Sequence, residues 1–244
     1  MTNYPLYIFF GILPSFLWLQ FYLRRDVRPE PKLMILKIFF YGMLATLPAI
    51  FLETAIFGEM GKLNFSGPII DILTIFLGAA LVEESLKFLV VKEKVLHDPE
   101  FDEPVDAMIY MIVAALGFAA AENILILFPL QSPLFKLTDI FQISLLRFLG
   151  ATFLHALCSA VVGFFIGLSF LRKGGGSQMR ASPKGGGRLI LLGLIIAVFL
   201  HGLYNFSIIK IEGNLRLLIP SLILIFSAIF VSFGFKWLRK IAKK

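Results

Sequence analysis

The amino-acid sequence predicts an all-α fold, a polytopic bundle of about seven transmembrane helices, and three observations support this prediction. Of the 244 residues, 58% are hydrophobic and 16% are charged, whereas soluble domains have about 45–50% apolar and about 25% charged residues. Apolar runs of about twenty residues, the length that crosses a bilayer as a helix, recur along the whole chain. The basic residues stand in short clusters between these runs, as in membrane proteins generally.

The predicted spans follow the hydropathy of the chain and fill most of it. They cover about residues 4–23, 34–57, 68–91, 105–128, 141–171, 189–209 and 215–236. We expect one membrane domain, residues 1–244, in which 172–188 forms a flexible, basic cytoplasmic loop. The run 141–171 is too long for one perpendicular span, so either its first turns lie at the interface or the helix is tilted. The N-terminal run lacks a basic n-region and a cleavage site, which predicts a retained helix.

Charge placement predicts the orientation of the chain and its surroundings. Eighteen of the 23 Lys and Arg residues fall on one side of the predicted spans, which places the C-terminus in the cytoplasm and the N-terminus outside. No basic stripe is interleaved with aromatic residues, so the net charge of +7 indicates contact with the lipid bilayer and not with nucleic acid. The single cysteine, Cys158, excludes an intramolecular disulfide. We expect a multi-pass protein of the cell membrane, most simply the bacterial cytoplasmic membrane.

Charged residues inside the third predicted span are the first candidates for function. Glu83, Glu84 and Lys87 lie within an otherwise apolar run, where each charge costs about 2.5–3.5 kcal/mol at a membrane centre. Glu83 and Lys87 share a helix face, but the two adjacent carboxylates point about 100° apart, so only one faces a given cavity directly. A structural ion pair with Lys87 extending to the interface is the alternative to a functional role.

The fourth predicted span carries acidic residues at both of its ends. Asp102, Glu103 and Asp106 lie at its start, where negative charge complements the helix dipole. Helix capping alone would explain Asp102 and Glu103, whereas Asp106 lies deeper and is harder to explain in this way. Glu122 and Asn123 follow a stretch of small residues that lets a neighbouring helix approach closely. With perpendicular helices Glu122 would lie roughly 10–15 Å from the level of Glu83. Either the helices tilt, or Glu122 has a supporting or structural role.

Two of the three histidines fall near the middle of predicted spans. His155 and His201 are both surrounded by apolar residues, and Asn205 follows His201 on the same helix face. A histidine or glutamate can act as a general base, and Asn205 can stabilise an oxyanion. Alternatively, His155, His201 and Glu122 form the ligand set of a hydrolytic zinc site with an open water position. The sequence has no His-Glu-x-x-His motif, so zinc rests on ligand types alone and the cofactor stays open.

Taken in order, these residues resemble the motifs of the PrsW family of bacterial intramembrane proteases, which is related to the CAAX-prenyl endopeptidases and to bacteriocin-processing membrane proteases. The matching stretches are Glu83-Glu84-Ser85-Leu86-Lys87, Phe101-Asp102-Glu103 with Asp106 and Tyr110, Gly117-Phe118 with Glu122-Asn123, His155-Ala156-Leu157 and His201-Gly202-Leu203-Tyr204. Ala107 and Met111 stand where the family pattern has glycines. Asn205 stands where relatives have aspartate, which favours hydrogen-bond donation over metal ligation.

The resemblance implies an intramembrane endopeptidase that cuts a membrane-anchored protein such as an anti-sigma factor, at the first of its cleavage sites. We expect Glu83 or Glu84 to activate water, with Glu122, His155 and His201 assisting. Asn205 would hold the oxyanion, Lys87 and Asn123 would support the site, and Glu103 and Asp106 would order its cytoplasmic mouth. Two other classes also place such residues in a membrane, namely a proton- or cation-coupled transporter and a non-enzymatic scaffold.

Overall fold

The computed structural model describes residues 4–25, 28–131, 136–171 and 183–242, and within these ranges it is helical with no strand. The all-α prediction is therefore confirmed. The elements in chain order are α1 (Tyr4–Leu23), α2 (Lys32–Met60), α3 (Gly67–Leu73), the π-helical η1 (Thr74–Ala80), α4 (Leu81–Lys94), α5 (Asp106–Leu127), the 3₁₀ helix η2 (Phe128–Gln131), α6 (Leu137–Leu149), α7 (Ala151–Leu171), α8 (Pro183–Lys210) and α9 (Leu215–Ala242).

Six helical stretches among the described residues are long and apolar enough to cross a membrane. They are Tyr4–Leu23, Lys32–Met60, Asp106–Leu127, Leu137–Phe170, Gly186–Lys210 and Leu215–Ile241. The predicted span 68–91 differs from these six, because its helical run is divided by the π-helical η1 and α4 is charged. The chain is still continuously helical from Gly67 to Lys94, so this run completes the bundle without being a regular α-helix.

Two predicted boundaries differ from the structure. The long run 141–171 is broken at Gly150, whose backbone (φ −108°, ψ −94°) separates α6 from α7. The long run is therefore divided into two helices, α6 and α7, and is not one regular helix. The last residues of the predicted loop 172–188 belong to a helix, because α8 begins at Pro183. Residues 172–182 lie outside the described part of the chain.

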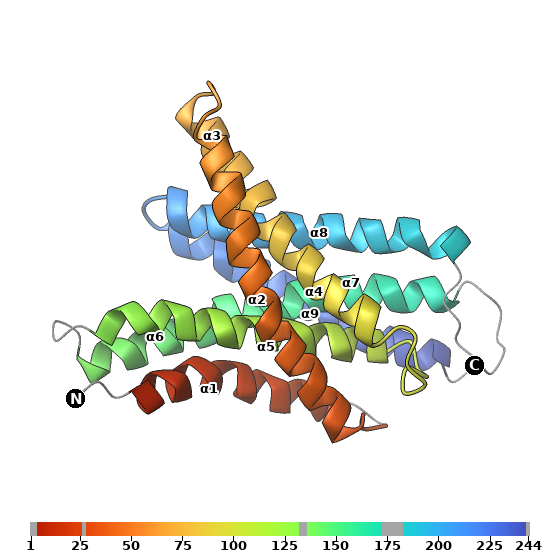
Figure 1. Cartoon of the computed structure of the whole chain (residues 1–244). Coiled ribbons are helices and arrows are strands. Elements are labelled where there is room, and N and C mark those ends of the chain that lie inside the picture. Colours follow the sequence, from red (N-terminus) through yellow and green to blue (C-terminus); the bar gives the residue numbers. More distant parts are fainter. Residues whose placement is uncertain (1–3, 26–27, 132–135, 172–182, 243–244) are drawn as a thin grey trace.

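Helix α5 forms the centre of the bundle. Every residue from Asp106 through Ala120 is buried, and α5 packs against α1, α2 and α7. Its sequence explains this position, since it is apolar around its whole circumference, as expected of a helix enclosed by others. Figure 1 shows α2 and the run from α3 to α4 passing obliquely across α5 and α7. These crossings bring residues at different heights of their own helices close together.

Several helix ends that adjoin basic clusters lie at the same end of the bundle. In Figure 1, α1 ends at the same side of the bundle as α4 and α9 end and α8 begins. These are the helix ends next to the basic clusters, such as Arg24 and Arg25 after α1 and Arg239 and Lys240 at the end of α9. The basic clusters thus gather at one end, and the assignment of that end to the cytoplasm stays a prediction.

Two glycines set the distance between α2 and α5. A Cβ atom added to Gly42 would meet the backbone carbonyl of Ala114, and one added to Gly117 would meet the backbone carbonyl of Phe39. The two helices therefore approach with backbone against backbone, as small residues allow in membrane bundles. This contact holds the helix that carries Glu122 and Asn123.

We predict that Gly117→Leu destabilises the protein strongly, because the added side chain must displace the α2 backbone. Overpacking of this kind costs about 1–3 kcal/mol or more. Thermal unfolding in detergent measures the effect. Gly58→Leu is the matched control, since a Cβ at this exposed position in α2 meets nothing within 4 Å. Equal unfolding temperatures for the two variants would contradict the close contact.

Candidate active site

The first two turns of α4 place two carboxylates and an ammonium group inside the bundle. Lys87 Nζ donates to Glu84 Oε1 at 2.8 Å and to Glu83 Oε2 at 3.1 Å. Lys87 and Glu84 are completely buried, and Glu83 is 7% exposed. Lys87 therefore does not extend to the membrane surface. The π-helical η1 ends three residues before Glu83, and such irregular turns frequently lie at functional sites.

Helices α7 and α8 bring the two buried histidines to this cluster. His155 Nδ1 accepts a hydrogen bond from Lys87 Nζ at 2.7 Å and lies 3.6 Å from Glu83 Oε2. His201 Nε2 lies 4.0 Å from the same Glu83 oxygen. The two imidazole rings are nearly perpendicular, with centroids 5.0 Å apart. His155 lies 68 residues after Lys87 in the chain and His201 lies 117 residues after Glu84, yet both meet at the carboxylate of Glu83.

Each histidine also bonds a second carboxylate through its other ring nitrogen. His155 Nε2 donates to Glu122 Oε2 at 2.9 Å, and His201 Nδ1 donates to Glu84 Oε1 at 2.9 Å. These bonds determine which nitrogen carries the proton. They leave His155 Nδ1 and His201 Nε2 unprotonated, on the sides of the two rings that face Glu83, and the Nδ1 lone pair accepts the bond from Lys87. A carboxylate behind each imidazole is the arrangement found in histidines that ligate metals.

The donor atoms that converge are those of Glu83, His155 and His201, and they lie within 4.8 Å of one another. All three residues are buried. Two imidazole nitrogens and a carboxylate oxygen are the ligand set of catalytic zinc sites. By donor type and position these residues fit a divalent metal, which would take the place of the Lys87 ammonium at Glu83 Oε2 and His155 Nδ1. The carboxylate grouped with the histidines is Glu83 rather than Glu122, the ligand expected from the sequence.

Glu122 nevertheless belongs to the same network, through His155. The crossing of α4 over α5 removes the height difference that perpendicular helices would impose (Figure 1). Glu122 Oε2 also accepts a bond from Arg147 Nη2 at 2.8 Å. Asn123 accepts a bond from Arg147 Nε and donates to the backbone carbonyl of Gly11 at 3.1 Å. Both residues of the Glu-Asn pair are thus tied to other helices.

Two residues of this network were missed from the sequence. Ser159 Oγ donates to Glu84 Oε2 at 3.0 Å, and it lies four residues after His155, on the same face of α7. Arg147 is among the five Lys and Arg residues that charge counting places on the side opposite the cytoplasm, and it was not expected in the site. It is the one basic residue between 141 and 171, and a lone arginine in an apolar run is the signal that could have identified it.

Three of the predicted site residues lie elsewhere. Asp106 Oδ2 accepts the backbone N–H groups of Asp102 and Glu103, at 3.1 and 2.7 Å, and so holds the turn that leads into α5. Glu103 pairs with the exposed Arg28 at 2.8 Å. Asp106 is 16 residues before Glu122, which is about 24 Å along a helix. Asn205 is half-buried one turn after His201, and in the described chain no hydrogen bond links it to the cluster.

A helical membrane bundle with buried Glu, His and His donors, each histidine backed by a carboxylate, defines a candidate intramembrane hydrolase. Comparison with known proteins assigns the family. Residues 30–233 match the model of the PrsW family intramembrane metalloprotease. This match covers most of the chain, so the chain belongs to that family. The family resemblance and the activity class inferred from the sequence are confirmed, and a protease family is not one of transporters or scaffolds.

Curated relatives of the chain carry the name Protease PrsW. The protein from Geobacillus kaustophilus is 30% identical over 203 residues, which are 83% of this chain and 79% of that protein. The proteins from Oceanobacillus iheyensis and Bacillus subtilis are each 27% identical, with 88% and 87% of this chain and the same shares of their own chains covered. No solved structure shows a significant match. As a member of this bacterial family, the chain is a multi-pass membrane peptidase.

We predict that Lys87→Met destabilises the protein when chelator keeps metal away. The substitution leaves two buried carboxylates without their countercharge, and breaking a buried pair in this way costs about 3–5 kcal/mol. Thermal unfolding in detergent with chelator measures the loss. Lys62→Met is the matched control, because Lys62 and its partner Glu59 are both mostly exposed and such pairs contribute little. A Lys87→Met variant as stable as Lys62→Met would contradict a buried, charge-balancing role.

Proposed function

We propose that this chain is a zinc-dependent endopeptidase that hydrolyses a peptide bond of a membrane-anchored protein. Glu83, His155 and His201 would hold the metal. The observation that carries the proposal is the convergence of these three buried donors. The family description as a metalloprotease supports the same conclusion. A zinc ion held there would supply Lewis-acid activation of water and of the scissile carbonyl.

The surrounding residues orient the ligands and move a proton. Glu84 holds the proton of His201 Nδ1, and Glu122 holds that of His155 Nε2. Glu84 also accepts bonds from Lys87 and Ser159, so both of its oxygens are engaged. The contacts of Lys87 and the two histidines with Glu83 are to its Oε2. Its other oxygen, Oε1, would accept a proton from the attacking water.

Two further residues have proposed supporting roles. Asn205 lies one helical turn after His201, and its amide would donate to the developing oxyanion once substrate is bound. Lys87 would balance the charge of Glu83 and Glu84 throughout the reaction. Glu103 and Asp106 would act at a distance, by fixing the start of α5 and its connection to Arg28.

A metal-free variant of the same hydrolysis is favoured by one observation. The Lys87 ammonium contacts both Glu83 Oε2 and His155 Nδ1, so the site can be charge-balanced without a metal. Glu83 would then activate water as a general base, with His155 and His201 as its partners. The zinc content of active enzyme distinguishes the two variants.

The depth of the site indicates the class of substrate. Glu83, His155 and His201 are all buried within helices of the bundle, so the scissile bond must reach them from the membrane or its edge. A protein with a single membrane anchor meets this requirement. In line with the family resemblance, we propose a membrane-anchored anti-sigma factor as the substrate.

The test combines metal analysis with cleavage of a membrane-anchored reporter by purified protein. Wild type is expected to hold about one zinc per chain and to lose cleavage with chelator. Glu83→Gln, His155→Ala and His201→Ala are each expected to lose zinc and at least about 100-fold in kcat.

His97→Ala is the matched control, since this third histidine is exposed and outside the bundle; its zinc content and kcat should equal those of wild type. Full cleavage by zinc-free wild type would reject the zinc-dependent mechanism in favour of the metal-free one. Unchanged cleavage in all three site variants would reject the assignment of the site.

A further inference from the structure

Arg147 is a charged side chain in an apolar part of the bundle. It lies in the last turn of α6, within the membrane-crossing stretch Leu137–Phe170, and its side chain is 15% exposed. A charge at the centre of a membrane helix costs about 2.5–3.5 kcal/mol. A partner must offset this cost, and the partner that the structure provides is Glu122.

The guanidinium group bonds two adjacent residues of α5 at once. Its Nη2 donates to Glu122 Oε2 at 2.8 Å, and its Nε donates to the side-chain oxygen of Asn123. The planar fork of an arginine can make both bonds, whereas a lysine has no such fork. The two contacts fix the orientation of Arg147 relative to α5.

The side chain of Asn123 is itself held by hydrogen bonds to two other helices. It is 1% exposed, and its amide nitrogen donates to the backbone carbonyl of Gly11 in α1 and to Thr152 Oγ1 in α7, both at 3.1 Å. Its oxygen has no other donor among the described residues than Arg147. Asn123 therefore serves as a fixed acceptor against which the guanidinium is positioned.

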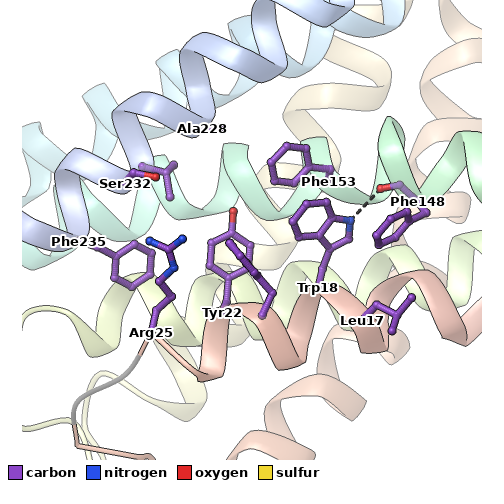
Figure 2. A pocket seen from close by; sticks show the side chains of 11 residues that line it. Leu17, Trp18, Tyr22, Arg25, Phe148, Phe153, Ala228, Ser232 and Phe235 are labelled. Atoms are coloured by element: carbon purple, nitrogen blue, oxygen red, sulfur yellow. Dashed lines mark hydrogen bonds between the residues drawn. The ribbon is translucent and has the colours of Figure 1, made fainter.

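The backbone that carries Arg147 is also held in place. Figure 2 shows Trp18 of α1 between Phe148 and Phe153, with its indole N–H directed at the Phe148 carbonyl. That bond is 2.8 Å long, and it satisfies a carbonyl at the end of α6. The indole stacks on Phe153 with centroids 4.0 Å apart and an interplanar angle of 6°. The junction of α6 and α7, from Arg147 to His155, is thus fastened to α1.

These contacts form a continuous path to the candidate metal ligand. Glu122 is 29% exposed in its side chain, so burial alone does not restrain its carboxylate. The bond from Arg147 and the bond from His155 Nε2 end on the same oxygen, Oε2. Without Arg147, the Glu122 carboxylate would be free to rotate toward solvent and release the His155 N–H.

We propose that Arg147 is a positioning residue, which holds Glu122 in the orientation that keeps the proton of His155 on Nε2 and its lone pair at Nδ1. Arg147 touches neither Glu83 nor the lone-pair side of His155, so it acts only through Glu122. This inference rests on the proposed function, since it assigns His155 Nδ1 the task of ligating the metal.

The experiment is a double-mutant cycle between Arg147→Met and Glu122→Gln, with zinc affinity measured by chelator competition. Loss of a partner behind a ligating histidine costs about 10–100-fold in metal affinity, and we expect this loss for Arg147→Met. In the Glu122→Gln background the same substitution should cause almost no further loss, because coupled residues are not additive. Arg147→Lys keeps the charge without the fork, and its affinity should fall between those of wild type and Arg147→Met.

Two further readouts separate positioning from a general structural effect. Cleavage by Arg147→Met should show a lower kcat with KM unchanged, since the substrate is not contacted. The ¹⁵N shifts of the His155 ring report the tautomer, and we expect the proton to leave Nε2 in Arg147→Met. Arg216→Met, at an exposed position at the start of α9, is the matched control and should change none of these values.

Several outcomes would overturn the proposal. They are wild-type zinc affinity and tautomer in Arg147→Met, or a loss that is fully additive with Glu122→Gln. If Arg147→Met does not fold, Arg147→Lys decides the question by the same measurements. Wild type that neither binds zinc nor cleaves would reject the proposed function, and the His155 ring shifts would still test the role of Arg147.

Discussion

The ion pair between Lys87 and the carboxylates of Glu83 and Glu84 is the interaction on which the rest of the site depends. Three charges removed from water carry a penalty of several kcal/mol each, which attraction offsets only when the remaining donors and acceptors are satisfied. Ser159, His155 and His201 supply those bonds. These side chains come from α7 and α8. The buried charges of α4 therefore require contact with both helices, and this requirement keeps the three helices together.

A second layer of polar contacts surrounds the first and reaches the other side of the bundle. Glu122 connects His155 to Arg147, and Asn123 connects Arg147 to α1 and α7. The central, enclosed helix α5 carries both residues, and its glycine contact with α2 fixes its position. The site is therefore held by packing of backbones as well as by hydrogen bonds, as preorganised sites require.

This arrangement explains how hydrolysis is compatible with a membrane. Buried histidines with carboxylates behind them present defined lone pairs, and a dry environment strengthens every electrostatic contact. The membership of the PrsW family gives the reaction class, while the geometry gives the three glutamates different positions. Glu83 faces both histidines, and Glu84 and Glu122 each lie behind one of them.

The sequence by itself determined the helical class, the approximate spans and the residue types of the site. Hydropathy reports which segments are apolar, and the cost of intramembrane charge identifies Glu83, Glu84, Lys87, His155 and His201 without any structure. Spacing along one helix also relates Glu83 to Lys87, because a helix has a fixed repeat. The ordered motifs were enough to indicate the family.

Only the tertiary structure decided how these residues meet. Spacing carries no information about helix crossing, so it could not show that α4 passes over α5 and joins Glu122 to His155. For the same reason it could not choose between Glu83 and Glu122 as the carboxylate beside both histidines. Spacing likewise could not show that Arg147, three residues before the break at Gly150, bonds Glu122 and Asn123 of α5. The helical repeat determines which residues share a face of one helix, whereas the packing between helices determines which faces meet and form the site.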